Sequence, residues 1–261
     1  MAKDVLQDSL LRCRYEMKYI ISQSRAAVIA HFVESYLIPD RYTKSQPTGF
    51  YPVVSLYLDS DTLQLCKESI HGILKRFKLR VRSYTDDPAY PRFFEVKRRS
   101  NTVIIKSRAR VAAEDVPILL SGRYVPPVQN YQEDIDALRQ FQLYMRSVGA
   151  KPVILVRYLR KAYESSTENR VRVTFDRQVA YKVSSDHNVL LSGSGWQHNP
   201  VTLQNVILEI KFTGRYPAWL ARMTRYFDLQ QWSVSKYATS MENACSLRFC
   251  APLAPIMVAR L

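Results

Sequence analysis

Regular alternation of apolar and charged residues is the main pattern along this chain, and it predicts β-strands. In the segment 78–83 (KLRVRS), Lys78, Arg80 and Arg82 alternate with Leu79, Val81 and Ser83, and the segment 106–110 (KSRAR) repeats the pattern. Residues two apart share one face of a strand, so each segment has one charged face and one largely apolar face. The segments 14–20 (RYEMKYI), 93–97 (FFEVK) and 206–212 (VILEIKF) follow the same rule with acids among the bases. One such strand is an ordinary half-solvated strand, but several of them indicate strands that curve together around an anion.

The same periodicity, followed along the whole chain, predicts an α+β protein with at least eight strands and few helices. The loop signals mark no convincing domain boundary, so residues 1–261 are expected to form a single domain. Strands are expected at 12–21, 53–59, 76–84, 93–97, 102–111, 153–163, 170–175 and 206–212. Helices are expected at 22–37, 130–148, 217–227 and 236–247, with a short one that ends at His71.

The charged strand faces can be placed in two ways. If they point outward, the protein is a sandwich with an extended cationic surface. If the sheet closes, they line a wet tunnel, and the helices at 22–37 and 130–148 cover the apolar outer faces. A tunnel lined by so many cations repels itself when empty, so we expect a multiply charged anion, with a metal ion, to fill it.

The charge balance also indicates a polyanionic partner. Lysine and arginine total 38 against 23 acids, a net charge of +15, and hydrophobic residues make up 47% of the chain, as in a folded protein. Nucleic acid, an anionic membrane and phosphate-rich small molecules all fit such a charge. A generally basic, soluble surface is the alternative, and the period-2 spacing of the charges argues against it.

Several function classes lack their sequence signals. The seven glycines form neither GxxxxGK[ST] nor GxGxxG, and no apolar run approaches the ~20 residues of a membrane span. The four cysteines have no CxxC spacing, which predicts reduced structural thiols, a cytoplasmic location and no zinc site.

Nine short motifs, in order, resemble those of a known family. RYExKY, SLYLD, KxRxRxY, FEVK, KxRxR, VRYxRxAY, RVTFD, LEIKF and SKY occur between about residue 14 and about residue 237. This order resembles the VTC domain, the polyphosphate polymerases of the triphosphate tunnel metalloenzyme (CYTH-like) superfamily. The resemblance implies a closed antiparallel β-tunnel that transfers the terminal phosphoryl group of ATP to a growing polyphosphate chain, with Mn²⁺ or Mg²⁺.

The resemblance also implies roles for individual residues. Lys236, Lys211 and Arg172 are the expected catalytic residues, and Glu209 is the expected metal ligand, with Glu16 as a second candidate. The expected phosphate-binding residues are Lys18, Lys78, Arg80, Arg82, Lys97, Arg108, Arg110, Arg157, Arg172, Lys211 and Lys236.

One departure from the superfamily pattern bears on the reaction. Tunnel hydrolases often carry Glu-x-Glu-x-Lys on the first strand, whereas this chain has Arg14, Glu16 and Lys18 at those positions. The loss of one metal carboxylate favours the polymerase over the hydrolases. The extra membrane and inositol-phosphate-binding domains of the eukaryotic polymerases are absent, so export of a polymer would need a separate membrane-protein partner.

The residues themselves suit phosphoryl transfer, which needs charge neutralisation and alignment more than covalent help. Three functions stay open: a polyphosphate polymerase, a tunnel triphosphatase acting on tripolyphosphate or nucleoside triphosphates, and a non-enzymatic binder of polyphosphate or nucleic acid. Nucleic acid is not expected, because most aromatic residues (Tyr15, Tyr19, Phe77 and Tyr158) fall on the face opposite the basic one, with Tyr84 and Phe93, both near strand ends, as exceptions. Tyr15, Tyr19, Tyr57 and Tyr158 are interpreted as packing on the outer face rather than as stacking platforms. Glu209 could also serve only as an ion-pair partner of Lys211.

Overall fold

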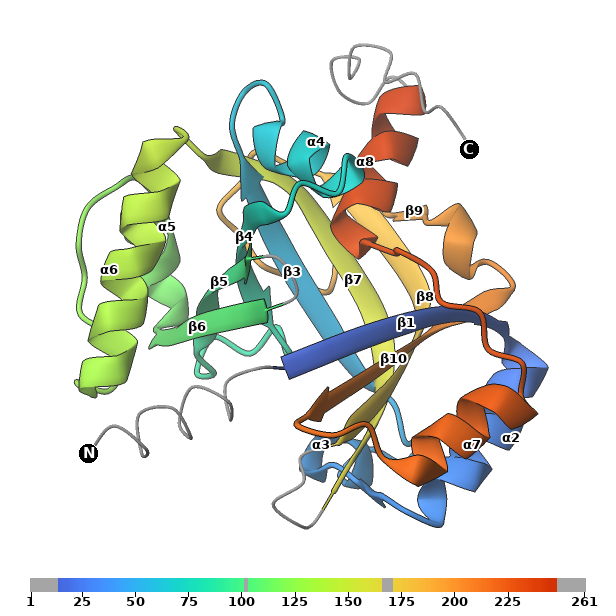
Figure 1. The fold of residues 1–261 in the computed structure, drawn as a ribbon. Helices are drawn as coiled ribbons and strands as arrows, with labels where there is room; N and C mark the ends of the chain where they lie inside the picture. The colour runs from blue at the N-terminus through green and yellow to red at the C-terminus, as the bar shows by residue number, and fades with distance from the viewer. Residues whose placement is uncertain (1–13, 101–102, 166–170, 248–261) are drawn as a thin grey trace.

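A long antiparallel sheet organises the protein, which we describe from a computed structural model covering residues 14–100, 103–165 and 171–247. Its strands follow the order β1-β10-β8-β7-β3-β4-β5-β6, with the short β2 and β9 beside β7 and β8 (Figure 1). The strands are β1 (Arg14–Ser22), β2 (Ile38–Pro39), β3 (Tyr51–Asp59), β4 (Lys75–Ser83), β5 (Arg92–Ser100), β6 (Val103–Val111), β7 (Lys151–Glu164), β8 (Arg172–Val183), β9 (Gln197–His198) and β10 (Asn205–Thr213).

The sheet curls until its two edge strands, β1 and β6, approach each other. Within the described ranges no hydrogen-bonded ladder joins these strands. The edge of β1 that faces away from β10 is partly occupied, because the amide of Trp232 donates to the carbonyl oxygen of Lys18 (2.9 Å) and Tyr19 bridges Gln231. The predicted α+β tunnel fold is confirmed as a curled sheet, whose strand pairing is not closed between β1 and β6 in the described residues.

Helices cover the apolar outer face of the curled sheet. In α6, Leu138 and Phe141 are buried, and the Phe141 ring meets Phe94 of β5 edge to face at 4.9 Å. In α2, Ile29 and Val33 pack in one cluster with residues of β1, β8, β10 and α7. Burial of one such side chain contributes about 1.5–3 kcal/mol. The covering roles predicted for the helices at 22–37 and 130–148 are confirmed.

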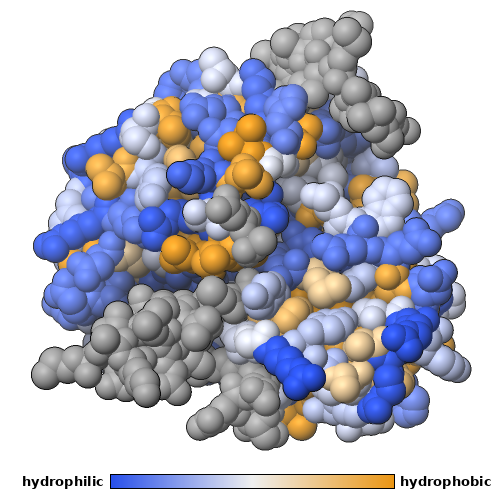
Figure 2. All heavy atoms as spheres, viewed as in Figure 1, coloured by the Kyte–Doolittle hydropathy of each residue, from blue (hydrophilic) through white to orange (hydrophobic). Residues whose placement is uncertain are grey.

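The helices contribute fewer elements to the fold than the strands do. They are α2 (Gln23–Glu34), α3 (Arg41–Lys44), α4 (Gln64–Ile70), α5 (Val116–Leu120), α6 (Gln132–Ser147), α7 (Ala218–Tyr226) and α8 (Lys236–Ser246), with two 3-10 turns at Ala113–Asp115 and Pro200–Thr202. On the face shown in Figure 2, hydrophilic side chains predominate and hydrophobic ones form small separate groups.

The last helix, α8, packs on the inner face of the sheet instead of the outer one. The ring of Tyr237 stacks on Tyr57 of β3 at 4.7 Å, and the Tyr237 hydroxyl contacts the buried carboxylate of Asp59 (2.5 Å). Asp59 also accepts from the amides of Leu65 and Cys66 at the start of α4 (2.9 and 2.8 Å). One buried carboxylate therefore ties α4 and α8 to the end of β3 and fixes where α8 begins.

Some expectations need correction. Strand β8 runs to Val183, whereas the sequence predicted an end near residue 175. The prediction ended too early because Gln178, which takes a positive φ of 52°, interrupts the period-2 pattern. Cys66 is free and buried, but Cys245 is disulfide-bonded, so the expectation of four reduced cysteines is wrong for Cys245. Among the described residues, no helix is long and apolar enough to cross a membrane.

Candidate functional site

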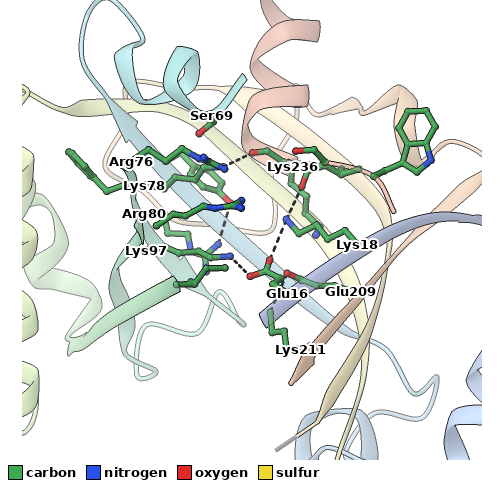
Figure 3. Close-up of a pocket in the computed structure, with 18 of the residues that line it drawn as sticks. Glu16, Lys18, Ser69, Arg76, Lys78, Arg80, Lys97, Glu209, Lys211 and Lys236 are labelled. Atoms are coloured by element: carbon green, nitrogen blue, oxygen red, sulfur yellow. Dashed lines mark hydrogen bonds and ion pairs between the residues drawn. The ribbon is translucent and has the colours of Figure 1, made fainter. Parts of the chain in front are cut away.

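A cavity of about 520 Å³ lies inside the curled sheet and is strongly cationic (Figure 3). Its walls come from β1, β3, β4, β5, β6, β7 and β10, from α4, from the segment before α8, and from the start of α8. Ten lysines and arginines line it, against two glutamates. They are Lys18, Arg76, Lys78, Arg80, Arg82, Lys97, Arg99, Arg160, Lys211 and Lys236, with Glu16 and Glu209.

The structure brings nine of the predicted site residues to this cavity. These residues meet because residues directly opposite each other on paired strands share a face of the sheet. Arg82 lies opposite Ser55, Lys18 opposite Glu209, and Glu16 opposite Lys211. The nine are Glu16, Lys18, Lys78, Arg80, Arg82, Lys97, Glu209, Lys211 and Lys236.

The two predicted metal ligands lie on one wall of the cavity. Lys97 Nζ contacts Glu16 Oε2 at 2.6 Å, and Lys211 Nζ contacts Glu209 Oε1 at 3.3 Å. Burial acts to raise the pKa of Glu209, but Lys211 and other cavity lysines outweigh it and hold this pKa well below its ordinary value. Burial and the adjacent Glu209 raise the pKa of Glu16, yet Lys97 and Lys211 keep it below its ordinary value. Both side chains are therefore anions at neutral pH.

A pair of carboxylates fits Mg²⁺ or Mn²⁺ only when the substrate supplies the remaining oxygens. Among the described residues there is no group of three or more His, Cys, Asp or Glu side chains that could hold an ion by themselves. Mg²⁺ commonly takes one or two carboxylates together with substrate phosphates and water. The donor set of Glu16 and Glu209 matches that mode, in which the metal arrives with the phosphate.

A second buried acid, Glu95, collects four cations beside the cavity. Its side chain is fully buried, and its oxygens contact Arg80 (2.7 Å), Lys106 (2.7 Å) and Arg108 (2.5 Å), with Arg82 at 3.9 Å. Burial acts to raise the pKa of Glu95, but Arg80, Arg82, Lys106 and Arg108 outweigh it and hold the pKa well below its ordinary value. Glu95 thus keeps the guanidinium of Arg80 in place at the cavity wall.

A third buried acid, Asp176 of β8, positions Lys236 and Arg160. Arg160 grips Asp176 with two hydrogen bonds of 2.6 and 2.7 Å, and Lys236 Nζ lies 2.6 Å from Asp176 Oδ2. Burial acts to raise the pKa of Asp176, but Arg160 and Lys236 lower it to about 2. Lys236 keeps a raised pKa despite burial, since Asp176 favours its charged form. Lys236 is therefore a fixed positive charge at the cavity.

The segment 229–235 between α7 and α8 forms a strap along one side of the cavity. Lys18 Nζ donates to the carbonyl oxygen of Val234 (2.7 Å), and Lys78 Nζ donates to Ser235 Oγ (2.7 Å). Burial lowers the pKa of Lys78 well below its ordinary value, with repulsion from Lys18 and Lys97 adding to it. An incoming phosphate would give Lys78 an anionic partner and favour its charged form.

Lys211 predicts a pH dependence of anion binding. Burial lowers its pKa to about 8, although Glu209 and Glu16 favour the charged form. An anion favours charged Lys211, so we expect the affinity for tripolyphosphate to fall as pH rises through about 8. Calorimetric titration between about pH 7 and about pH 9.5 checks it against the Lys211→Met variant, which lacks the titrating group. If the affinity for tripolyphosphate fell equally steeply with pH in the two proteins, the role of Lys211 would be contradicted.

Four predicted phosphate-binding residues lie away from the cavity lining. Arg157 points to the other side of β7, where it stacks on Trp196 (4.2 Å) and donates to the carbonyl oxygen of Leu191 (2.5 Å). Arg110 pairs with Asp134 at the start of α6 (2.8 Å). Arg108 is held by Glu95, and Arg172 by two acids described below.

Other cavity residues were missed or misplaced by the sequence reasoning. Arg160 takes the place expected for Arg157, and both lie in one motif, so spacing alone could not choose between them. Tyr57 and Tyr158 were expected on the outer face, which is wrong, since both line the cavity. Their hydroxyls accept from Arg80 (3.4 Å) and Arg82 (3.3 Å), and they serve as neutral partners where carboxylates are few.

The curled sheet and the cavity inside it place the protein in the class that encloses a cationic tunnel. The chain belongs to the VTC domain family, whose model matches residues 13–245. No curated protein matches the chain in sequence.

Two solved structures resemble the chain in fold. The PH1819 protein from Pyrococcus horikoshii OT3 is 15% identical, with a TM-score of 0.44 over 89% of this chain and 98% of that one. HpAC1 from Hippeastrum, reported to have a dominant triphosphatase activity, is 11% identical, with a TM-score of 0.47 over 88% of this chain and 96% of that one.

Proposed function

We propose that this protein is a polyphosphate polymerase that transfers the terminal phosphoryl group of ATP to a growing polyphosphate chain. The observation that carries the proposal is the cavity itself, in which ten lysines and arginines face two glutamates inside a member of the VTC domain family. Such a lining neutralises the charge of a linear phosphate chain, which is the main requirement of phosphoryl transfer.

The cavity residues divide into two groups by chemistry. Arginines such as Arg80 and Arg82 grip nonbridging oxygens in a fixed fork, and lysines such as Lys211 and Lys236 act as point charges. Glu16 and Glu209 would hold the divalent ion, Mn²⁺ or Mg²⁺, which supplies charge stabilisation between phosphate oxygens when it is bound. Lys211 and Lys236 remain the proposed catalytic residues.

Arg172, the third residue proposed as catalytic, is less available in this structure. Its guanidinium contacts Asp40 Oδ2 and Glu164 Oε2, both at 2.6 Å. A catalytic role for Arg172 would need a phosphate oxygen to replace one of these carboxylates. Lys236 is also paired with a carboxylate, but Lys236 and Lys211 line the cavity and Arg172 does not, so we propose Lys211 and Lys236 as the main catalytic residues.

Incubation of pure protein with ATP and Mn²⁺ tests the proposed reaction. Long-chain polyphosphate, resolved on a gel, is the expected product. Orthophosphate as the main product would show a tunnel triphosphatase instead. Neither product, with tight binding of polyphosphate, would show a binding protein without this activity.

Tripolyphosphate should also stabilise the folded protein strongly. A ligand that binds only the folded state adds RT ln(1 + [L]/Kd), or about 2.7 kcal/mol at a hundredfold excess over Kd. We expect a clear rise in Tm, and a smaller rise with double-stranded DNA, because a duplex is too wide for the cavity. Arg80→Ala should shrink the tripolyphosphate shift, whereas Arg157→Ala, which changes an arginine outside the cavity, should leave it. Equal shifts in the two variants would favour binding at an external surface.

A further inference from the structure

Two arginines, which we call the mouth pair, face each other at the edge of the cavity beside the strap. Arg76 of β4 and Arg99 of β5 are directly opposite partners in the strand ladder, and both line the cavity. Residues in this relation have Cβ atoms about 4.5–5.5 Å apart, and like charges there destabilise the sheet. The mouth pair lies outside the motifs KxRxR, which begins at Lys78, and FEVK, which ends at Lys97. The sequence motifs therefore assign it no role.

Strand register places the mouth pair one step beyond the central cations. On β4, Arg76, Lys78 and Arg80 share the inner face, and Figure 3 shows them pointing into the same cavity. Lys78 lies opposite Lys97, whose ammonium group contacts Glu16 at 2.6 Å. Because residues two apart in a strand are separated by about 7 Å, the mouth pair lies that much farther along the sheet than the proposed metal ligand Glu16.

The cavity is open to solvent at the mouth pair. Trp232 of the strap is 58% exposed and lines the cavity, together with Gln231 and Ser233, which are exposed as well. Arg99 is itself exposed, and Arg76 is half-buried. A linear anion that is longer than the central part of the cavity can therefore extend past the mouth pair into solvent.

Charge compensation is weak at Arg76. Its guanidinium donates to the carbonyl oxygen of Ile73, which is a neutral acceptor. On the far side of the mouth pair, the residue directly opposite Arg99 is Ile104 of β6, which is uncharged. Burial and then repulsion from Arg99 lower the pKa of Arg76, and the carboxylate of Glu68 on α4 offsets this only in part. An anion placed between the two guanidinium groups would relieve their repulsion.

We propose that the mouth pair is a further phosphate-binding subsite, which holds the part of a linear polyphosphate chain that lies beyond the centre of the cavity. The inference rests on the proposed function in taking linear phosphate chains as the ligand. Guanidinium groups bind pairs of nonbridging phosphate oxygens, and two of them face each other here. The uncharged nucleoside of ATP would offer the same groups no anion.

The length of the inner face explains why only longer chains use this subsite. From Arg82 to Arg76 the face extends about 20 Å along β4, which is much longer than a triphosphate. A triphosphate held at the centre, where Arg80, Lys211 and Lys236 lie, leaves the mouth pair unused. A longer chain reaches both regions, so the subsite makes the protein select polyphosphate over short phosphate compounds.

Affinity as a function of chain length tests this inference. Calorimetric titration without added metal, so that no ligand is turned over, compares tripolyphosphate, ATP and a linear chain of about ten phosphates, which is long enough to span the inner face of β4. We expect Arg76→Ala and Arg99→Ala each to weaken binding of the long chain about tenfold, which is the effect of losing one charge-assisted contact. The affinities for tripolyphosphate and ATP should change by less than about twofold.

A neighbouring arginine provides the matched control. Arg98 lies next to Arg99 on the other face of β5, where it donates to the Tyr144 hydroxyl (3.3 Å). Arg98→Ala removes the same charge from the protein and should leave all three affinities near those of the wild type. Melting curves show whether each variant is folded, and the two separate changes in the mouth pair guard against one that is not.

The outcomes separate this inference from the proposed function. Unchanged binding of the long chain in both variants, or an equal loss for tripolyphosphate, would overturn the subsite and leave the proposed function standing. A loss for ATP alone would show that the mouth pair binds the nucleoside, which also overturns the subsite. Failure of the wild type to bind tripolyphosphate and the long chain would overturn the proposed function.

Discussion

Replacing Glu209 by glutamine is expected to abolish metal-dependent turnover while leaving the fold intact. Glutamine keeps the size of the side chain but removes the charge that attracts a divalent ion into a cavity of cations. With Glu16 as the remaining carboxylate, we expect kcat/KM to fall by about a hundredfold or more, or about 2.7 kcal/mol of transition-state stabilisation. Initial rates with ATP over a range of Mn²⁺ concentrations measure it.

A matched variant separates this effect from a general loss of charge. Glu133→Gln makes the same change at an exposed position on α6 and should keep wild-type activity. Circular dichroism and a melting curve show whether Glu209→Gln is folded. Wild-type turnover in Glu209→Gln would mean that Glu209 is only an ion-pair partner of Lys211, the alternative that the sequence left open.

The alternation of charged and apolar residues was enough to predict the main strands and the charged interior. Arg80, Arg82 and Lys97 could be placed because β4 and β5 are regular and pair without a bulge. The reason is general: a regular strand puts every second side chain on one face, and no tertiary information is needed.

Positions near irregularities could not be predicted in the same way. The register of β7 and β8 shifts between Arg157 and Leu159, where β8 contains Gln178 with positive φ. Beyond such a bulge the inward and outward faces exchange, so a period-2 pattern loses its meaning. The choice between Arg157 and Arg160 has a different cause, because β7 pairs regularly with β3 over these residues. A spacing of three puts the two arginines on opposite faces, and alternation alone cannot tell which face is the inner one.

The roles of the buried acids also depend on the fold. Glu95 and Asp176 each lie in a motif that the sequence shows, but their partners come from other strands and from α8. Spacing along the chain gives the residue type and face, whereas the choice of partner depends on how the strands curl. The same holds for Asp40 and Arg172, which meet from positions 132 residues apart.

Replacing Glu95 by glutamine is expected to destabilise the empty protein by about 3–5 kcal/mol, because it leaves buried cations without their counterion. Arg80, Lys106 and Arg108 all lie within 2.7 Å of Glu95, whose side chain is fully buried. Urea unfolding at pH 7 measures the loss, and Glu133→Gln, on the exposed face of α6, should change stability by less than about 0.5 kcal/mol.

The pH dependence of this effect has a definite sign. The pKa of Glu95 is held well below its ordinary value in the folded protein. Its contribution is therefore complete above the ordinary carboxyl pKa and disappears as pH falls through the depressed folded value. The stabilities of the wild type and of Glu95→Gln should converge at acidic pH, and a constant difference at all pH values would contradict the ion-pair account.

Phosphate should reverse much of the loss in this variant. In the wild type, Glu95 already neutralises part of the charge on Arg80 and its neighbours, so a bound anion gains less there. In Glu95→Gln the same cations are unpaired, and tripolyphosphate should raise Tm by more than it does in the wild type. A smaller shift in the variant would mean that Glu95 positions Arg80 for the anion, and that this orientation matters more than the charge it cancels.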